Sequence, residues 1–149
     1  MITLTKVLYT AVATAEGGRD GHTATDDGKL DVKLSPPAEM GGPADAVGTN
    51  PEQLFAAGYS SCFHSALKLV AQRLKLDPEG STVTARVGIG PIEGSPGFGL
   101  TVELDVSLPN VPDAEQAQQL LERSHKVCPY SNAISGNVEV KLAIVPSAG

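Results

Sequence analysis

The chain has 149 residues, of which 17 are acidic and 11 are basic, so its formal net charge is −6. This charge and the six aromatic residues (three Phe, three Tyr, no Trp) disfavour nucleic-acid binding, which needs cations against phosphate and rings for stacking. No apolar run approaches the ~18 residues of a membrane span, and the first residues lack the continuous apolar stretch of a secretory signal. We therefore expect one soluble, cytoplasmic domain over residues 1–149, with neither a nucleic-acid nor a membrane partner.

The N-terminal third of the sequence predicts three strands followed by a loop. Apolar and polar side chains alternate over residues 2–14, which predicts a strand. A glycine-rich turn at 16–21 leads to a second strand near 22–26, and Asp27-Gly28 indicates a hairpin into the third. Residues 35–49 are rich in Pro and Gly, and a loop of this length in a small domain is often functional.

A long helix is predicted next. Asn50 is a good N-cap, Pro51 suits the first helical position, and the helix should end near Leu74, before Pro78. We expect a polar stripe and an opposite buried face, the latter made of Phe55, Tyr59, Cys62, Ala66, Leu69 and Val70.

The remaining elements complete an α+β domain. Alternation predicts strands around residues 83–89 and 100–108, joined by a glycine-rich hairpin with bulges at 88–99. Asp113-x-x-Gln116 resembles a capping box, so a second helix should run to about Lys126, where Glu122 and Lys126 form an i,i+4 pair. A last strand is expected at 138–144. The predicted order is βββ-α-ββ-α-β, with an antiparallel sheet packed against one long central helix.

Two cysteines carry most of the chemical interest. Cys62 lies in the middle of the long helix, where burial alone would raise the thiol pKa and make it inert. It is twelve residues past the N-cap, beyond the reach of the helix dipole, so a reactive Cys62 needs a cation from elsewhere. Cys128 follows the second helix, 66 residues later, and the sequence alone does not bring the two sulfurs together.

Three chemical interpretations compete for these cysteines. Cys62-x-His64 with His125-x-x-Cys128 has ligands suited to zinc, although positions 62 and 64 point about 200° apart on a helix. Cys128-Pro129-Tyr130-Ser131 matches a one-cysteine glutaredoxin motif, although outside the βαβ context of that motif. The third interpretation is a two-cysteine peroxidase, in which Cys62 attacks and Cys128 resolves.

Other polar residues have ordinary structural explanations when taken alone. His22 and His64 are typical of structural or exposed histidines, and Arg19 beside Asp20 is typical of a polar turn. Glu52 is a favourable charge at a helix N-terminus.

Three motifs together resemble the organic hydroperoxide resistance (Ohr) branch of the OsmC/Ohr family, over essentially the whole chain. They are Gly17-Gly18-Arg19-Asp20-Gly21, the stretch from Asn50-Pro51-Glu52-Gln53 through Ser61-Cys62-Phe63, and His125-x-x-Cys128-Pro129-Tyr130-Ser131. The resemblance implies a thiol peroxidase for organic hydroperoxides, including those of fatty acids, that defends against peroxide stress. Cys62 would be the peroxidatic residue, Cys128 the resolving residue, and Arg19 with Glu52 the charged pair beside the thiol.

The resemblance further implies an intertwined homodimer with two active sites at the subunit interface. Re-reduction would come from dihydrolipoamide or a lipoylated protein, and no metal or bound cofactor is implied. A rival interpretation with the same fold is a non-enzymatic protein that binds a lipid-like ligand and has inert cysteines.

Helix geometry adds a separate hypothesis. Glu52 and Cys62 are ten residues apart on one helix, which places them about 15 Å apart along its axis. One side chain does not close that gap. We therefore expect at least one charged partner of Cys62 to come from a second subunit.

Overall fold

The computed structural model describes residues 1–147, which form two compact units. The first unit is Met1–Pro51 and the second begins at Glu52. Each unit contains a three-stranded sheet. The three α-helices of the described residues belong to the second unit, apart from Pro51, the first residue of the longest helix. The α+β class predicted from the sequence is confirmed, as is the order of its predicted elements.

The first unit is an antiparallel sheet in the order β1-β2-β3, formed by Ala13–Glu16, His22–Thr25 and Asp31–Lys33. The short 3-10 helix η1 (Gly18–Asp20) lies between β1 and β2, and a second one, η2 (Ala38–Met40), follows β3. Gly17 and Gly18 both adopt positive φ, and this glycine pair lets the chain reverse tightly between β1 and β2.

The predicted first strand begins much later than expected. Residues 2–12 are not in a strand, and their large apolar side chains are exposed. Their alternating pattern is real, but a strand also needs a neighbour that supplies hydrogen bonds, and within the described chain β1 pairs with β2 only from Ala13 onward.

The second unit contains the sheet β4-β5-β6, formed by Thr82–Pro91, Phe98–Ser107 and Val140–Ile144. β4 and β5 are antiparallel and keep one register over ten residue pairs, so the bulges predicted for the glycine-rich hairpin are absent from this ladder. β6 runs parallel to β5, which makes the sheet mixed where an antiparallel sheet was predicted. The long connection through two helices reverses the chain before it returns to the sheet.

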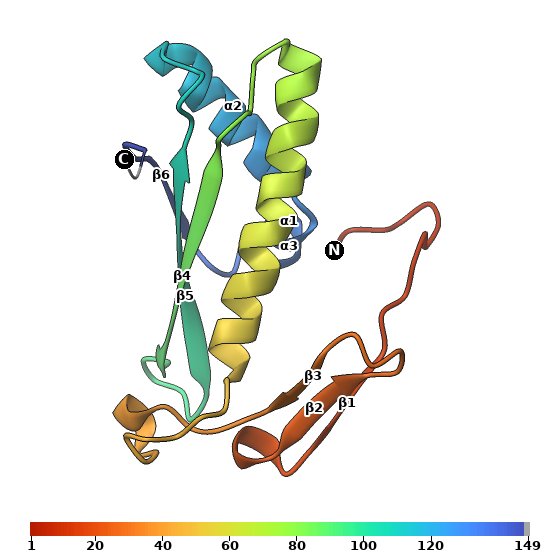
Figure 1. Ribbon diagram of the computed structural model, residues 1–149, viewed down its shortest axis with the longest axis vertical. Coiled ribbons are helices and arrows are strands. Elements are labelled where there is room, and N and C mark those ends of the chain that lie inside the picture. The colour runs from red at the N-terminus through yellow and green to blue at the C-terminus, as the bar shows by residue number, and fades with distance from the viewer. Residues whose placement is uncertain (148–149) are drawn as a thin grey trace. The chain divides into compact units, whose positions relative to one another are not determined.

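Helix α1 (Pro51–Leu74) has the predicted bounds. Helix α2 (Ala114–Val127) is capped by Asp113, whose carboxylate accepts the backbone N–H of Gln116 at 2.8 Å, as the capping box predicts. A third helix, α3 (Pro129–Ile134), was not predicted and begins directly after Cys128. Figure 1 shows α1 lying along the sheet, with α2 beside it.

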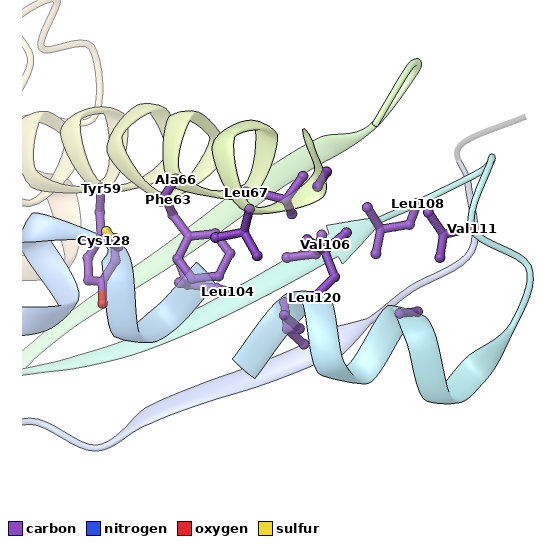
Figure 2. Close-up of a cluster of buried hydrophobic side chains, with 14 of the residues drawn as sticks. Tyr59, Phe63, Ala66, Leu67, Leu104, Val106, Leu108, Val111, Leu120 and Cys128 are labelled. Atoms are coloured by element: carbon purple, nitrogen blue, oxygen red, sulfur yellow. The ribbon is translucent and has the colours of Figure 1, made fainter. Parts of the chain in front are cut away.

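The core of the second unit forms where α1, α2 and the sheet meet. Figure 2 shows Phe63 and Leu67 pointing from α1 toward Leu104 and Val106 of β5. The buried residues of α1 are Tyr59, Phe63, Ala66, Leu67, Val70 and Ala71.

The buried face of α1 is therefore rotated from the predicted one. Leu69 is 42% exposed, whereas Phe63 and Leu67 are fully buried. No helix among residues 1–147 has both the length and the apolar character needed to cross a bilayer.

Candidate functional site

The fold brings the two cysteines together. Cys62 lies in the middle of α1 and is partly exposed, while Cys128 is fully buried and forms the N-cap of α3. The two side chains are neighbours. The charge of Cys128 and a hydrogen bond with its thiol both raise the pKa of Cys62. Both are free thiols in this structure. Two sulfurs separated by 66 residues of sequence thus share one site.

A cluster of three aromatic rings lies beside the thiols. Tyr130 follows Cys128 by two residues, and its ring lies 5.9 Å from the ring of Phe55 and 5.6 Å from that of Tyr59. Gly58 makes room for it, since a Cβ on that residue would lie 2.6 Å from the Tyr130 hydroxyl oxygen. The aromatic cluster gives the site an apolar wall that joins α1 to α3.

A buried hydrogen-bond chain fixes α3 to its neighbours. The Ser131 hydroxyl lies 2.7 Å from the Tyr59 hydroxyl and 2.8 Å from Nδ1 of His125. These three residues come from α3, α1 and α2 respectively. Because Ser131 is buried and polar, its two partners provide the hydrogen bonds that burial demands. The chain locks the segment that carries Cys128 and Tyr130.

Within this unit the ionisation of Cys62 is unfavourable. Burial is the largest cause and raises the pKa of the Cys62 thiol. A backbone hydrogen bond from Tyr130 lowers that pKa, while Cys128 raises it, and the net shift is upward. Burial also raises the pKa of Tyr59, and charge on either cysteine raises it further, which places this hydroxyl near both sulfurs. A thiolate at Cys62 therefore needs an added positive charge.

Glu52 and Arg19 are the two charged residues that the resemblance implies for the site. Glu52 is in the first turn of α1, ten residues before Cys62. Arg19 belongs to η1 of the first unit. The structure thus brings together Cys62 and Cys128, and places Glu52 about 15 Å from Cys62 along the axis of their common helix.

The competing interpretations of the cysteines do not match this geometry. His64 Nε2 bonds to Ser81 at 2.9 Å and His125 Nδ1 bonds to Ser131, so these imidazoles have partners other than sulfur. Residues 1–147 contain no group of three or more His, Cys, Asp or Glu side chains arranged to hold a metal ion. The glutaredoxin-like motif follows α2 and not a first strand.

Sequence reasoning missed part of this site. Tyr59, Tyr130, Ser131 and His125 were not among the predicted site residues, although all four lie in the quoted motifs. A signal for two of them was the presence of Tyr and Ser two and three residues after Cys128, because both side chains have hydroxyls that donate and accept hydrogen bonds.

Comparison with known proteins identifies the family of this chain. The sequence model of the family described as OsmC-like protein matches residues 41–143. The chain belongs to the OsmC-like family. A protein of Xanthomonas axonopodis pv. citri named "Organic hydroperoxide resistance protein" is 53% identical over 140 residues, which is 93% of this chain and 96% of that protein.

Solved structures of OsmC-like proteins share the fold. An organic hydroperoxide resistance protein of Elizabethkingia anophelis, crystallised with thiocyanate, has a TM-score of 0.87 and 53% identity, and the match covers 95% of this chain and 99% of that one. One from Vibrio cholerae, described as putative and with captopril in one of its active sites, has a TM-score of 0.88 and 44% identity, and the match covers 95% of each chain.

Proposed function

We propose that this OsmC-like protein is a thiol peroxidase that reduces organic hydroperoxides, including those of fatty acids, to alcohols. The observation that carries the proposal is the contact between Cys62, which is partly exposed, and Cys128, which is buried. An accessible thiol beside a second thiol is the arrangement that a two-cysteine peroxidase needs. The names of the relatives agree with this class of substrate.

The proposed reaction has three steps. The Cys62 thiolate attacks one peroxide oxygen, the O–O bond breaks, and the departing alkoxide takes a proton and leaves as an alcohol. The Cys62 sulfenic acid then condenses with the Cys128 thiol, which forms a disulfide and releases water. Two electrons from dihydrolipoamide or a lipoylated protein restore both thiols, and the lipoyl dithiol becomes its cyclic disulfide.

Arg19 is proposed as the cation that the thiolate needs. Burial raises the pKa of Cys62 in its own unit, and a permanently charged guanidinium would oppose that shift. The same group would donate to the alkoxide as it departs. We propose that Glu52 orients Arg19 without taking part in proton transfer.

We further propose that the chain works as one domain over residues 1–149 within a homodimer, in the cytoplasm. The family match spans the boundary between the two units, which supports a single functional domain. Apolar side chains left exposed along residues 2–12 support association with a second copy. Since one helix separates Glu52 from Cys62, at least one charged partner of each thiol would come from the second subunit.

Replacement of each cysteine tests the chemistry. Cys62→Ser should abolish reduction of organic hydroperoxide, because no nucleophile remains. Cys128→Ser should still consume one equivalent of hydroperoxide per site but should fail to turn over with dihydrolipoamide. Full multiple-turnover activity of Cys62→Ser would overturn the proposal.

Mixed dimers test the origin of the charged partner. Random mixing of Arg19→Ala chains with Cys62→Ser chains should give mixed dimers in half of the population. If Arg19 acts across the interface, each mixed dimer has one intact site out of two. About a quarter of the unmodified activity should then return. The same applies to Glu52→Gln mixed with Cys62→Ser. The matched control is Cys62→Ser mixed with Cys128→Ser, which should restore nothing because these thiols act within one chain. The hypothesis is wrong if neither charged pair complements.

A further inference from the structure

Helix α3 lies directly after Cys128, and its own side chains give it little apolar anchorage. Ser131 is the only buried residue among its six. Four of the others are exposed, and Ile134, at the far end of the helix, is partly buried against the core. A helix this short is not stable by itself, and few buried apolar side chains hold this one in place. Its position therefore depends largely on other contacts.

The Ser131 hydroxyl is the buried contact that ties α3 to both neighbouring helices. It lies 2.7 Å from the Tyr59 hydroxyl oxygen of α1 and 2.8 Å from Nδ1 of His125 in α2. The exposed Asn132 side chain donates to the Lys126 carbonyl at 3.1 Å, which links α3 to α2 alone. A buried polar network that is fully satisfied specifies one arrangement, because a displacement leaves its members unsatisfied in the interior.

The position of Cys128 is coupled to that of Ser131. Cys128 is the single residue between α2 and α3. Its backbone N–H donates to the Ser124 carbonyl at 2.9 Å, and its carbonyl accepts the N–H of Asn132 at 3.0 Å. Ser131 follows Cys128 by three residues, which is less than one helical turn. A shift of Ser131 therefore moves the Cys128 thiol as well.

Disulfide formation between Cys62 and Cys128 tolerates little movement of either thiol. The S–S bond is about 2.05 Å long, and the two Cβ atoms must come within about 3.5–4.5 Å of each other. A misplacement of reacting groups by about 1 Å costs up to about a hundredfold in rate. While the Cys62 sulfenic acid waits for Cys128, a second hydroperoxide competes for the same sulfur. The placement of the Cys128 thiol thus decides which reaction is faster.

We propose that Ser131 is a positioning residue that holds the Cys128 thiol against Cys62 and so protects Cys62 from over-oxidation. The inference rests on the proposed peroxidase function and adds a residue that controls the fate of the sulfenic acid. With α3 held, the sulfenic acid condenses with the Cys128 thiol and releases water. With α3 displaced, a second hydroperoxide transfers one oxygen to the Cys62 sulfenic acid, which becomes a sulfinic acid, and leaves as an alcohol.

The test follows the fate of Cys62 by intact mass as reduced protein meets increasing cumene hydroperoxide. A disulfide lowers the mass by about 2 Da, whereas a sulfinic acid raises it by about 32 Da. In Ser131→Ala the rate of disulfide formation should fall by about ten- to a hundredfold, and the sulfinic fraction should rise accordingly. Ser131→Thr keeps a hydroxyl and should restore most of the rate. Tyr59→Phe removes one partner of Ser131 and should have a smaller effect in the same direction.

Two control variants separate positioning from a general loss of stability. Asn132→Ala removes the exposed hydrogen bond of the same helix. Leu67→Ala removes a fully buried side chain of α1, which destabilises the unit but deletes no member of the buried hydrogen-bond chain. Both should form the disulfide at nearly the unmodified rate. A Leu67→Ala variant that over-oxidises as readily as Ser131→Ala would overturn the inference.

Equilibration with glutathione tests Ser131 without any peroxide. The equilibrium between the thiol pair and glutathione disulfide measures the effective concentration of the Cys128 thiol at Cys62. Ser131→Ala should lower that concentration by about tenfold or more. If the unmodified protein reduces no peroxide, the proposed function fails while this equilibrium still judges Ser131. An effective concentration that both Ser131→Ala and Tyr59→Phe leave unchanged would overturn the inference, and so would an unchanged sulfinic fraction in both.

Discussion

Loss of the Ser131 hydroxyl is expected to destabilise the second unit far more than the size of the change suggests. Ser131 is buried, and its hydroxyl lies 2.7 Å from the Tyr59 hydroxyl and 2.8 Å from His125 Nδ1. In Ser131→Ala both groups lose this partner, and a buried polar group left unsatisfied costs about 1–3 kcal/mol. We expect a loss of about 2–3 kcal/mol, which for a chain of this size lowers Tm by roughly 4–12 °C.

The assay is urea unfolding at one fixed protein concentration, since association would make stability depend on concentration. Ser124→Ala is the matched control, because Ser124 is equally buried but bonds only to the Leu120 carbonyl of its own helix. That control should cost less than about 1 kcal/mol. Tyr59→Phe combined with Ser131→Ala should be less destabilised than the sum of the single changes. Equal costs for the two serine variants would refute the role assigned to the buried hydrogen-bond chain.

Three further outcomes follow from the geometry. Gly58→Ala should change the free energy of unfolding by less than about 1 kcal/mol, because helix propensity improves while the Tyr130 ring is displaced. The same variant should change the alkylation rate of the Cys62 thiol. An unchanged rate would contradict the wall assigned to Tyr130. Leu67→Ala, at a fully buried position, should cost about 2–5 kcal/mol in urea unfolding, and a cost below 1 kcal/mol would contradict the core described above. Burial lowers the pKa of His125, so the unfolded chain takes up the proton first and stability should fall as pH drops below about 6.5. A free energy of unfolding that is equal at pH 7.5 and 5.5, or a decline that His125→Asn leaves as steep, would argue against that linkage.

The elements that sequence predicted well are those whose signals are local. The start of α1 after Asn50 and the cap of α2 at Asp113 depend on residues within one turn, and both helices have the predicted bounds. The strand predicted over residues 2–14 depended on a distant neighbour, which within the described chain exists only from Ala13. Local pattern alone does not supply a partner strand.

The buried face of α1 and the thiol pair show the same limit. The periodicity of α1 allows several apolar faces, and packing against β5 selects the one containing Phe63 and Leu67. The contact of Cys62 with Cys128 depends on where α2 ends and α3 begins, and α3 itself was not predicted. The roles proposed for Cys62 and Cys128 rest on motif resemblance, and the fold supplies the proximity of the two thiols.

The most direct test of the account is a count of free thiols after reduced protein meets one equivalent of an organic hydroperoxide. We expect both thiols to disappear together, one alcohol to be released per chain, and the intact mass to fall by about 2 Da as the Cys62–Cys128 disulfide forms. A chain that binds the peroxide and keeps both thiols would be a lipid-binding protein and not a peroxidase. Oxidation of Cys62 that leaves the Cys128 thiol free would contradict the resolving role.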